Sequence, residues 1–376
     1  MTILPSEEGG DLRPPEHIVY GDPCERGRQH GRHLKDTLEI PDMNVDPDFV
    51  RGCYRAAENA YPPIIPRFEG MAIAGGFERS WDHGFLPYYF ARLESQLGGP
   101  GGCTIFGVPP ALRSRPGRGT LVGRNYDWAA VDRKWCRLRR VFPALEPDRI
   151  GYTHHWAGLA DVLTEEGLYI AIASLPPEPV ASPGVQWHVV VDMLAGACSH
   201  VDDAIEKCAE VRHLRPMSYI LADEDTVAVV EATPSEIRVR RGSAGPVVVA
   251  NVPLGGQLLN NWRESGRQTY HPHPQNYSDG AIRRAKRRIS YGRSMLDRST
   301  EHSPLDFMRL LRDHTVPLCT GNHTRTDPES WSTIWSGLCE PSPRTFRIAP
   351  GPPCLYPYLD FGRNFAGRIN EPPSTF

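Results

Sequence analysis

Short runs of β-branched and aliphatic residues, separated by turn residues, characterise the chain from residue 104 onward. The runs occupy residues 104–108, 120–128, 167–174, 218–223, 227–231 and 247–251. Side chains of this kind are enriched in strands, and turn residues on both sides of a short run mark where a strand ends. We therefore expect a strand at each run, and together the runs predict a substantial sheet system.

The first third of the chain has a different pattern, which predicts mainly helices. Residues 21–38 begin with a turn and continue into a helical segment, and Leu86–Leu97 places aromatic residues and leucines at helical spacing. Later in the chain, Ser199 and Ser303 stand where helices are expected to begin, and Pro304 suits the first position of the second helix. Helices that interleave with antiparallel strands predict an α+β fold.

The composition argues against several classes of partner. Of the 376 residues, 40% are hydrophobic and 23% are charged, which is ordinary for a water-soluble globular protein. The formal net charge of -3 argues against nucleic acid as the main partner, because no strong positive field is present to attract phosphates. The N-terminal residues show no secretory leader and no apolar run is long enough to span a membrane, so we expect a cytoplasmic protein without membrane contact.

The stretch around Cys103 carries the main candidate for chemistry. Four glycines and a proline occupy residues 98–102, which gives the cysteine a flexible approach, while the apolar run 104–108 would hold its thiol in place. If the thiol attacks the Gly102 carbonyl and the thioester is hydrolysed, Cys103 becomes an N-terminal residue. Its α-amino group titrates near pH ~8 and can accept the thiol proton. On this stretch alone, a buried structural cysteine is the commoner interpretation.

Several separated segments of the chain follow one another in an order found in one enzyme family. They are residues 25–31, 102–104, 123–128, 165–168, 218–223, 250–251 and 310–354. In this ordered set the chain resembles the autoproteolytic acyltransferases and hydrolases similar to acyl-CoA:6-aminopenicillanic acid acyltransferase. These are cysteine N-terminal nucleophile hydrolases, related to choloylglycine hydrolases and acid ceramidase. The resemblance implies a four-layer αββα sandwich. It also implies a mainly helical leader of residues 1–102, kept as a small subunit, and a catalytic domain of residues 103–376.

The resemblance also implies catalytic roles for four residues. Cys103 would be the nucleophile, Asp127 would hold its amine, and Arg124 would lower the thiol pKa and orient the acyl oxygens. Because Arg124 and Asp127 are three positions apart on one predicted strand, a twist or a bulge is needed for both to approach the same neighbour. Asn251 ends a predicted strand, where its amide could donate to the oxyanion of a tetrahedral intermediate. The simpler alternatives are a strand-end ion pair and a turn asparagine.

Three further residues are weaker candidates for contacts in a substrate pocket. Ser174 stands where choloylglycine hydrolases have an asparagine, so the resemblance implies that this donor is replaced or built differently. Glu166 and Arg263 are the other two, and solvated surface charge is the simpler interpretation of both. Residues 263–280 are rich in turn residues and predict a mobile surface loop.

The cysteines and histidines do not predict a metal site. Cys319 with His323, and His271 with His273, could each supply two ligands, but neither has a second pair at the spacing of a zinc finger. The nine cysteines include no CxxC pair, which argues against a disulfide framework. We expect no metal and no nucleotide-loop cofactor.

Together these features predict a self-cleaving enzyme that forms an acyl thioester on Cys103. The acyl group would come from a linear amide or an acyl-CoA and would pass to water or to an amine, in keeping with a role in secondary metabolism. One alternative is an uncleaved thiol hydrolase in which a separate histidine, such as His314, activates Cys103. Another is a non-catalytic binding protein with the same fold. The sequence leaves open the acyl donor, the acceptor and whether the protein forms a homo-oligomer.

Overall fold

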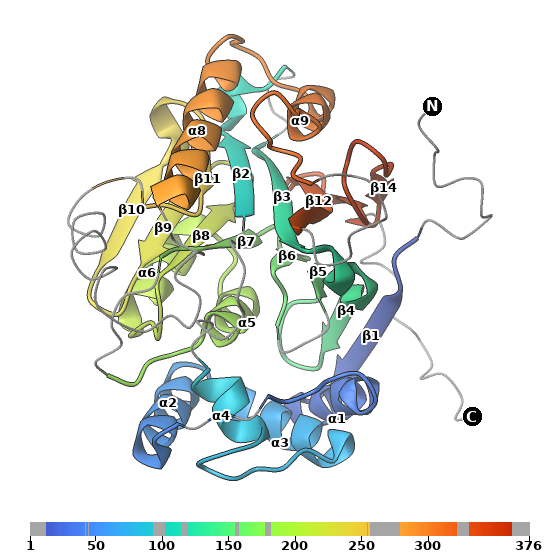
Figure 1. Ribbon diagram of the computed structural model, residues 1–376, viewed down its shortest axis with the longest axis vertical. Coiled ribbons are helices and arrows are strands. Elements are labelled where there is room, and N and C mark those ends of the chain that lie inside the picture. Colours follow the sequence, from blue (N-terminus) through green and yellow to red (C-terminus); the bar gives the residue numbers. More distant parts are fainter. Residues whose placement is uncertain are drawn as a thin grey trace.

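Two β-sheets form the centre of the protein in this computed structural model (Figure 1). The structure describes residues 13–41, 43, 45–92, 102–114, 119–154, 158–176, 182–253, 255, 279–321 and 331–362. Within these residues the larger sheet has eight strands, in the spatial order β1-β4-β5-β6-β7-β8-β9-β10. Their bounds are β1 Glu16–Gly21, β4 Cys136–Pro143, β5 Arg149–His154, β6 Asp161–Thr164, β7 Tyr169–Ser174, β8 Met217–Ala222, β9 Val227–Ala232 and β10 Ile237–Arg241. β1 and β4 run parallel, whereas the other neighbouring strands are antiparallel.

The smaller sheet carries the candidate nucleophile. Among the described residues it has six antiparallel strands, in the order β11-β2-β3-β12-β13-β14. Their bounds are β2 Gly102–Val108, β3 Leu121–Ala129, β11 Val247–Ala250, β12 Trp331–Glu340, β13 Thr345–Ala349 and β14 Leu359–Asp360. β2 has a neighbour on each side and is buried along its whole length, so Cys103 lies in the interior of the fold.

Helices cover the outer faces of both sheets. α5 (Trp187–Ala197) packs on β6 and α6 (Val201–Glu210) packs on β8 and β9. On the other side, α8 (Asp279–Leu296) packs on β2 and β11, and α9 (Pro304–Leu311) packs on β3 and β12. Between the sheets, β2 contacts β7 and β11 contacts β9. The layers are therefore helix, sheet, sheet, helix, which confirms the α+β sandwich predicted from the sequence.

The first third of the chain is mainly helical, as predicted. β1 is followed by α1 (Pro23–Leu34), α2 (Pro47–Ala60), α3 (Ile64–Gly75) and α4 (Phe85–Phe90), which lie together at the bottom of Figure 1. β1 itself is paired with β4, so the N-terminal part contributes an edge strand to the larger sheet. Among the described helices, none combines the length and apolar character that a membrane span requires.

The predicted strands are confirmed closely, and the differences have physical causes. β2 begins at Gly102, earlier than the apolar run, because a glycine can pair in a strand without an apolar side chain. The sequence pattern does not reveal β4, since arginines interrupt its apolar residues. The helix expected at Ser199 has His200 as its N-cap instead, whereas Ser303 and Asp306 form the expected reciprocal cap of α9. α4 ends at Phe90, and residues 93–97 of that prediction lie outside the described residues.

Candidate active site

Cys103 and Arg124 lie on the same face of the smaller sheet, in the space between the two sheets. Successive side chains of a strand point to opposite faces. In β2, a Cβ on Gly107 would meet Val227 of the larger sheet, so the odd positions, including Cys103, face that sheet. From β3, the Arg124 guanidinium Nη2 reaches within 3.3 Å of the Cys103 Sγ. Ordinary strand alternation therefore brings the thiol and the guanidinium together.

Asp127 approaches β2 from the opposite face of the sheet, the face covered by α8. Its register partner in β2 is Gly102, and a Cβ on that glycine would lie 2.6 Å from Asp127 Oδ2. Arg124 and Asp127 thus both approach β2, as expected, but β3 alternates regularly between them and needs no bulge. The register shift in this part of the sheet lies in β12, between Thr333 and Trp335. The peptide bond between Gly102 and Cys103 consequently has the carboxylate on one side of the sheet and the guanidinium on the other.

The backbone nitrogen and the thiol of Cys103 each have a partner. The nitrogen donates to Asn251 Oδ1 at 2.6 Å, and the sulfur accepts from Arg124. The side chain is only 5% exposed. Burial raises the pKa of the Cys103 thiol above its ordinary value, and although Arg124 opposes this shift, burial outweighs it. In the uncut chain the thiol is therefore protonated at neutral pH, and its attack on a carbonyl requires a base.

A buried acid holds Arg124 in position. Arg124 Nη1 donates to Asp161 Oδ1 at 2.5 Å, and both side chains are fully buried. Burial alone would lower the pKa of Arg124, but Asp161 raises it, so the guanidinium remains charged. Trp335 Nε1 donates to the other oxygen of Asp161 at 2.9 Å, and the Arg124 guanidinium lies 4.8 Å from the centre of the Tyr126 ring. This arrangement fixes the direction in which the guanidinium points.

Three donors surround the Asp127 carboxylate. Arg288 Nη1 of α8 and Thr320 Oγ1 donate to Oδ2 at 3.1 and 2.9 Å, and Thr333 Oγ1 of β12 donates to Oδ1 at 2.7 Å. Burial raises the pKa of Asp127 above its ordinary value, although Arg288 and the two threonines oppose the shift. Asp127 therefore organises side chains from three segments around Gly102, while Asn251 accepts the hydrogen bond from the Cys103 nitrogen.

Asn251 joins the nucleophile to Ser174. Its Nδ2 donates to the backbone oxygen and to the Oγ of Ser174, at 3.0 and 3.1 Å. Its Oδ1 accepts from the Cys103 nitrogen and also from Arg288 Nη2, which is 3.3 Å away. In the uncut chain both ends of this amide are engaged. The structure thus brings Ser174 into the site, next to the asparagine that was expected there.

Of the other two pocket candidates, the structure describes only Glu166. Glu166 is exposed in the turn before β7 and accepts a hydrogen bond from Ser199. Arg263 lies outside the described residues, as do residues 263–278 of the predicted surface loop and the histidines at 271, 273 and 323. The loop prediction is wrong at residues 279 and 280, which begin α8. His314, the histidine proposed for an uncleaved thiol hydrolase, lies beside Cys319 and Cys354.

The sequence analysis missed the residues that support the site. Arg288 belongs to the arginine-rich helix α8, but helical spacing from Ala285 places it on the apolar face of that helix, a signal that could have found it. Asp161, Thr320 and Thr333 come from segments far from Cys103 in sequence and have no local pattern that predicts their roles. Only the packing of the strands brings them together.

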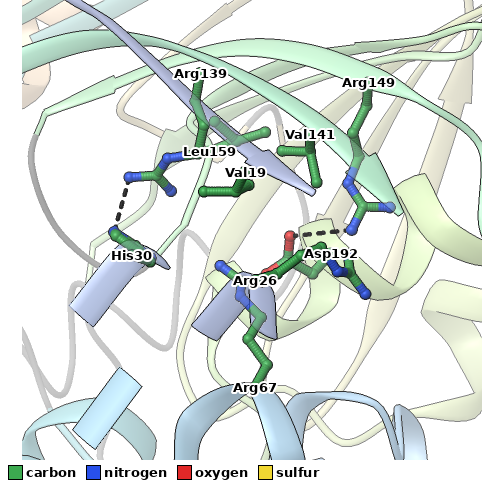
Figure 2. Close-up of a pocket in the computed structure, with 9 residues that line it drawn as sticks. All are labelled: Val19, Arg26, His30, Arg67, Arg139, Val141, Arg149, Leu159 and Asp192. Atoms are coloured by element: carbon green, nitrogen blue, oxygen red, sulfur yellow. Dashed lines mark hydrogen bonds and ion pairs between the residues drawn. The ribbon is translucent and has the colours of Figure 1, made fainter. Parts of the chain in front are cut away.

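A second polar cluster lines a small cavity between the N-terminal helices and the larger sheet (Figure 2). Its lining residues are Val19, Arg26, His30, Arg67, Arg139, Val141, Arg149, Leu159 and Asp192. Arg67 pairs with Asp192, while Arg26 and Arg149 pair with Glu146. Burial and Arg139 lower the pKa of His30 well below its ordinary value, so the neutral ring accepts from Arg139 Nη2 at 2.9 Å. This cluster shares no residue with the Cys103 site and joins helices to strands.

The matching part of the chain identifies the enzyme family. A sequence model of the acyl-coenzyme A:6-aminopenicillanic acid acyl-transferase family matches residues 114–353. The chain belongs to this family. It is an N-terminal-nucleophile-type enzyme, a hydrolase or acyltransferase that acts on amide bonds. The match includes Arg124, Asp127 and Asn251 but begins after Cys103.

Several solved structures are similar to the chain at low identity. A mutant conjugated bile acid hydrolase from Clostridium perfringens is 14% identical, with a TM-score of 0.44, and the match covers 70% of this chain and 97% of that one. Penicillin V acylase from Agrobacterium tumefaciens is 16% identical, with a TM-score of 0.41 and coverage of 69% and 86%. The Caenorhabditis elegans N-acylethanolamine-hydrolyzing acid amidase ortholog is 13% identical, with a TM-score of 0.40 and coverage of 64% and 92%. No curated protein sequence matches the chain.

Proposed function

We propose that Cys103 is the nucleophile of a self-cleaving amidohydrolase or acyltransferase. The observation that carries this proposal is the paired environment of Cys103, whose nitrogen donates to Asn251 at 2.6 Å while its sulfur lies 3.3 Å from Arg124. Both groups that an N-terminal cysteine uses, the thiol and the future amine, therefore have a fixed partner. A buried structural cysteine would also need a partner for its backbone nitrogen, but it would not need a cation beside its sulfur.

The proposed maturation cuts the bond between Gly102 and Cys103. The Cys103 sulfur attacks the Gly102 carbonyl carbon, its thiol proton passes through water to the nitrogen, and the C–N bond breaks to leave an amine. Water then hydrolyses the resulting thioester, which releases the Gly102 carboxylate and restores the thiol. The products are a leader of 102 residues and a catalytic part of 274 residues, which is 376 minus 102. The leader would stay bound as a small subunit, because β1 is paired with β4.

In turnover, the free amine of Cys103 would serve as the base for its own thiol. The amine accepts the thiol proton, the sulfur attacks the acyl carbon of the substrate, and the leaving amine or thiol takes up the proton as the acyl thioester forms. Water or an acceptor amine then attacks the thioester and frees the cysteine. Asn251 would hold the amine through Oδ1, and Arg124 would stabilise the thiolate and orient the acyl oxygen. Asn251 donates to the oxyanion only if its Nδ2 turns away from Ser174, and that role stays a prediction.

The substrate class we propose is a linear amide or an acyl-CoA thioester. The family description, with its acyl-coenzyme A donor and its amine acceptor, supports this choice. A role in secondary metabolism, a cytoplasmic location and a homo-oligomer stay predictions.

Intact-mass measurement on the purified protein tests the proposal. We expect the wild type to give two polypeptides that meet at the bond between residues 102 and 103, whereas Cys103→Ala stays one chain and is inactive. Incubation of the cleaved enzyme with a panel of amides and acyl-CoA thioesters should add an acyl mass to the fragment that begins at Cys103. A Cys103→Ala protein that is still cut at this bond would show that an outside protease makes the cut. If the cleaved wild type still turns over an amide but no acyl donor adds mass to it, Cys103 is not the nucleophile.

A further inference from the structure

Two cysteines and a histidine, far apart in sequence, meet beside the Asp127 network. The ligand atoms of His314, Cys319 and Cys354 all lie within 4.8 Å of one another, and the two sulfurs are 3.6 Å apart. Cys319 is buried, Cys354 is partly buried and His314 is exposed, so the group runs from the interior to the surface. None of the nine cysteines forms a disulfide, and Cys319 Sγ donates a hydrogen bond to Cys354 Sγ.

The backbone that carries these three residues is held by hydrogen bonds. The nitrogens of Leu318 and Cys319 both donate to the Asp313 carbonyl oxygen, at 3.2 and 3.1 Å. Tyr291 of α8 donates to the Asp313 side chain at 2.6 Å, which fixes this turn to the helix. Arg312 Nε donates to the carbonyl oxygen of residue 353 at 2.8 Å, so the segment before Cys354 is tied to the same turn. His314, Cys319 and Cys354 therefore lie on two segments that a hydrogen bond connects.

We propose that His314, Cys319 and Cys354 form a binding site for a zinc-like divalent cation. In a tetrahedral site with Zn–S bonds of about 2.3 Å, two ligand sulfurs lie about 3.8 Å apart, close to the separation in this protein. A disulfide would need the sulfurs to approach to about 2.05 Å. Two thiolates and one imidazole are a ligand set that zinc prefers, and a water molecule would supply the fourth ligand. Because His314 is exposed, its side chain could shift to bring a ring nitrogen within bonding distance of the ion.

The bound ion would stabilise the candidate active site through the segment that links Cys319 to Asp127. Cys319 is followed directly by Thr320, whose hydroxyl donates to Asp127 at 2.9 Å. A cation on Cys319 and Cys354 would fix the segment that carries Thr320, and so would limit the motion of the Asp127 carboxylate next to Gly102. The role is structural, and it does not depend on Cys103 being the nucleophile.

Zinc binding to the full chain tests this proposal. The protein is prepared without a histidine tag and in the Cys103→Ala background, so that neither a tag nor the candidate nucleophile binds metal. A phosphine reductant keeps the thiols reduced. After incubation with excess zinc and removal of unbound ion, we expect about one zinc per chain. Substitution with cobalt should give the near-ultraviolet absorption of thiolate-to-cobalt charge transfer.

Two variants and one control identify the ligands. His314→Ala and Cys354→Ser should each lose most of the bound metal and the charge-transfer band, and zinc should raise the unfolding temperature of the parent chain but not that of the variants. Cys24→Ser, which replaces a partly exposed cysteine on α1, should bind zinc as the parent does. His314 is exposed, so its variant tests the proposal even if the cysteine variant folds poorly. The proposal is wrong if the parent binds no zinc, or if both variants retain it.

Discussion

At the scale of single residues, the bond between Gly102 and Cys103 is constrained from both faces of a strand. The sequence suggested a flexible glycine beside a fixed cysteine, but Gly102 is itself buried and paired in β2. It is a glycine because no space exists for a side chain, since a Cβ would overlap the carboxylate and guanidinium on the α8 face. The carbonyl that we propose is attacked is therefore positioned by the same contacts that hold Asp127.

The first prediction concerns this close approach. In Gly102→Ala, the new Cβ would lie 2.6 Å from Asp127 Oδ2 and 2.9 Å from Arg288 Nη1, so both side chains must shift. We expect self-cleavage to slow by tenfold or more, roughly the cost of a small misplacement at a reacting centre. The fraction of cut chain, followed by intact mass during cell-free synthesis, measures this rate. Gly337→Ala is the matched control, because its Cβ would meet its nearest neighbour at an ordinary 3.5 Å. Equal cleavage rates for the two variants would contradict the prediction.

A second prediction concerns Arg288, which contacts both Asp127 and Asn251. In Arg288→Gln the buried Asp127 carboxylate loses the cation that pairs with it, and burial then raises the pKa of Asp127 further. We expect the turnover number of any cleaved enzyme to fall by roughly a hundredfold, with a smaller change in KM. Arg287→Gln, which removes an exposed neighbour on the same helix, should behave as the wild type. If the two variants have the same kinetics, Arg288 does not position the site.

At the scale of elements, α1 and α3 cross at backbone contact. A Cβ on Gly27 would lie 2.0 Å from the Arg67 carbonyl oxygen, one on Gly31 would lie 2.2 Å from that of Met71, and one on Gly70 would lie 2.1 Å from that of Cys24. These glycines therefore let the two helices approach more closely than any side chain permits. The segment 25–31, which helped to indicate the family, is explained by helix packing rather than by chemistry.

The third prediction tests this crossing. Alanine normally favours a helix over glycine by about 1 kcal/mol, but in Gly31→Ala the clash with a backbone oxygen must separate α1 from α3. We expect a net loss of about 2 kcal/mol or more in the free energy of unfolding. Urea unfolding in the uncut Cys103→Ala background measures it. Arg28→Ala, on the exposed face of the same helix, should leave the free energy within about 0.5 kcal/mol. A Gly31→Ala protein as stable as its parent would show that the helices can move apart freely.

At the scale of the whole molecule, ion pairs and a strand join the N-terminal part to the rest of the fold. Glu146, beyond β4, accepts from Arg26 of α1 and from the hydroxyl of Tyr61 at the end of α2, and it also pairs with Arg149 of β5. Burial alone would raise the pKa of Glu146, but Arg149 and Arg26 lower it to about 2. Together with the pairing of β1 and β4, these contacts would hold a cleaved leader in place.

The fourth prediction is a dependence of stability on pH. Because the pKa of Glu146 is lowered in the folded protein, the carboxylate stabilises the fold fully above its ordinary value of 4.5, and this stabilisation is lost as the pH falls toward about 2. Glu146→Gln should therefore unfold more easily than the uncut parent at pH ~7, by roughly 3 kcal/mol, and the difference should shrink as the pH falls below ~4.5. Urea unfolding of both proteins across this range measures it. If the difference in unfolding free energy between the two proteins does not change with pH, the charge of Glu146 does not stabilise the contact between the N-terminal helices and the larger sheet.

The amino-acid sequence determined much about this protein by itself. The β-branched runs predicted β2, β3, β7, β8, β9 and β11, because local side-chain type is enough to favour an extended segment. The ordered motifs indicated the family that the sequence match then showed. They also named Cys103, Arg124 and Asn251, which the structure brings into one site. These features are local in the chain, so a linear pattern can carry them.

Only the tertiary structure decided how those residues are arranged. Asp127 and Arg124 lie on opposite faces of the sheet, and Asp161 and Arg288 hold them, because strand alternation and packing, not sequence spacing, set the direction of each side chain. The same reason explains why the sequence predicted no metal site. The spacing after Cys319 offered no second pair of ligands, whereas the fold brings Cys354 from 35 residues away to within 3.6 Å. Contacts between distant segments depend on the packing of the whole chain, and no local pattern contains them.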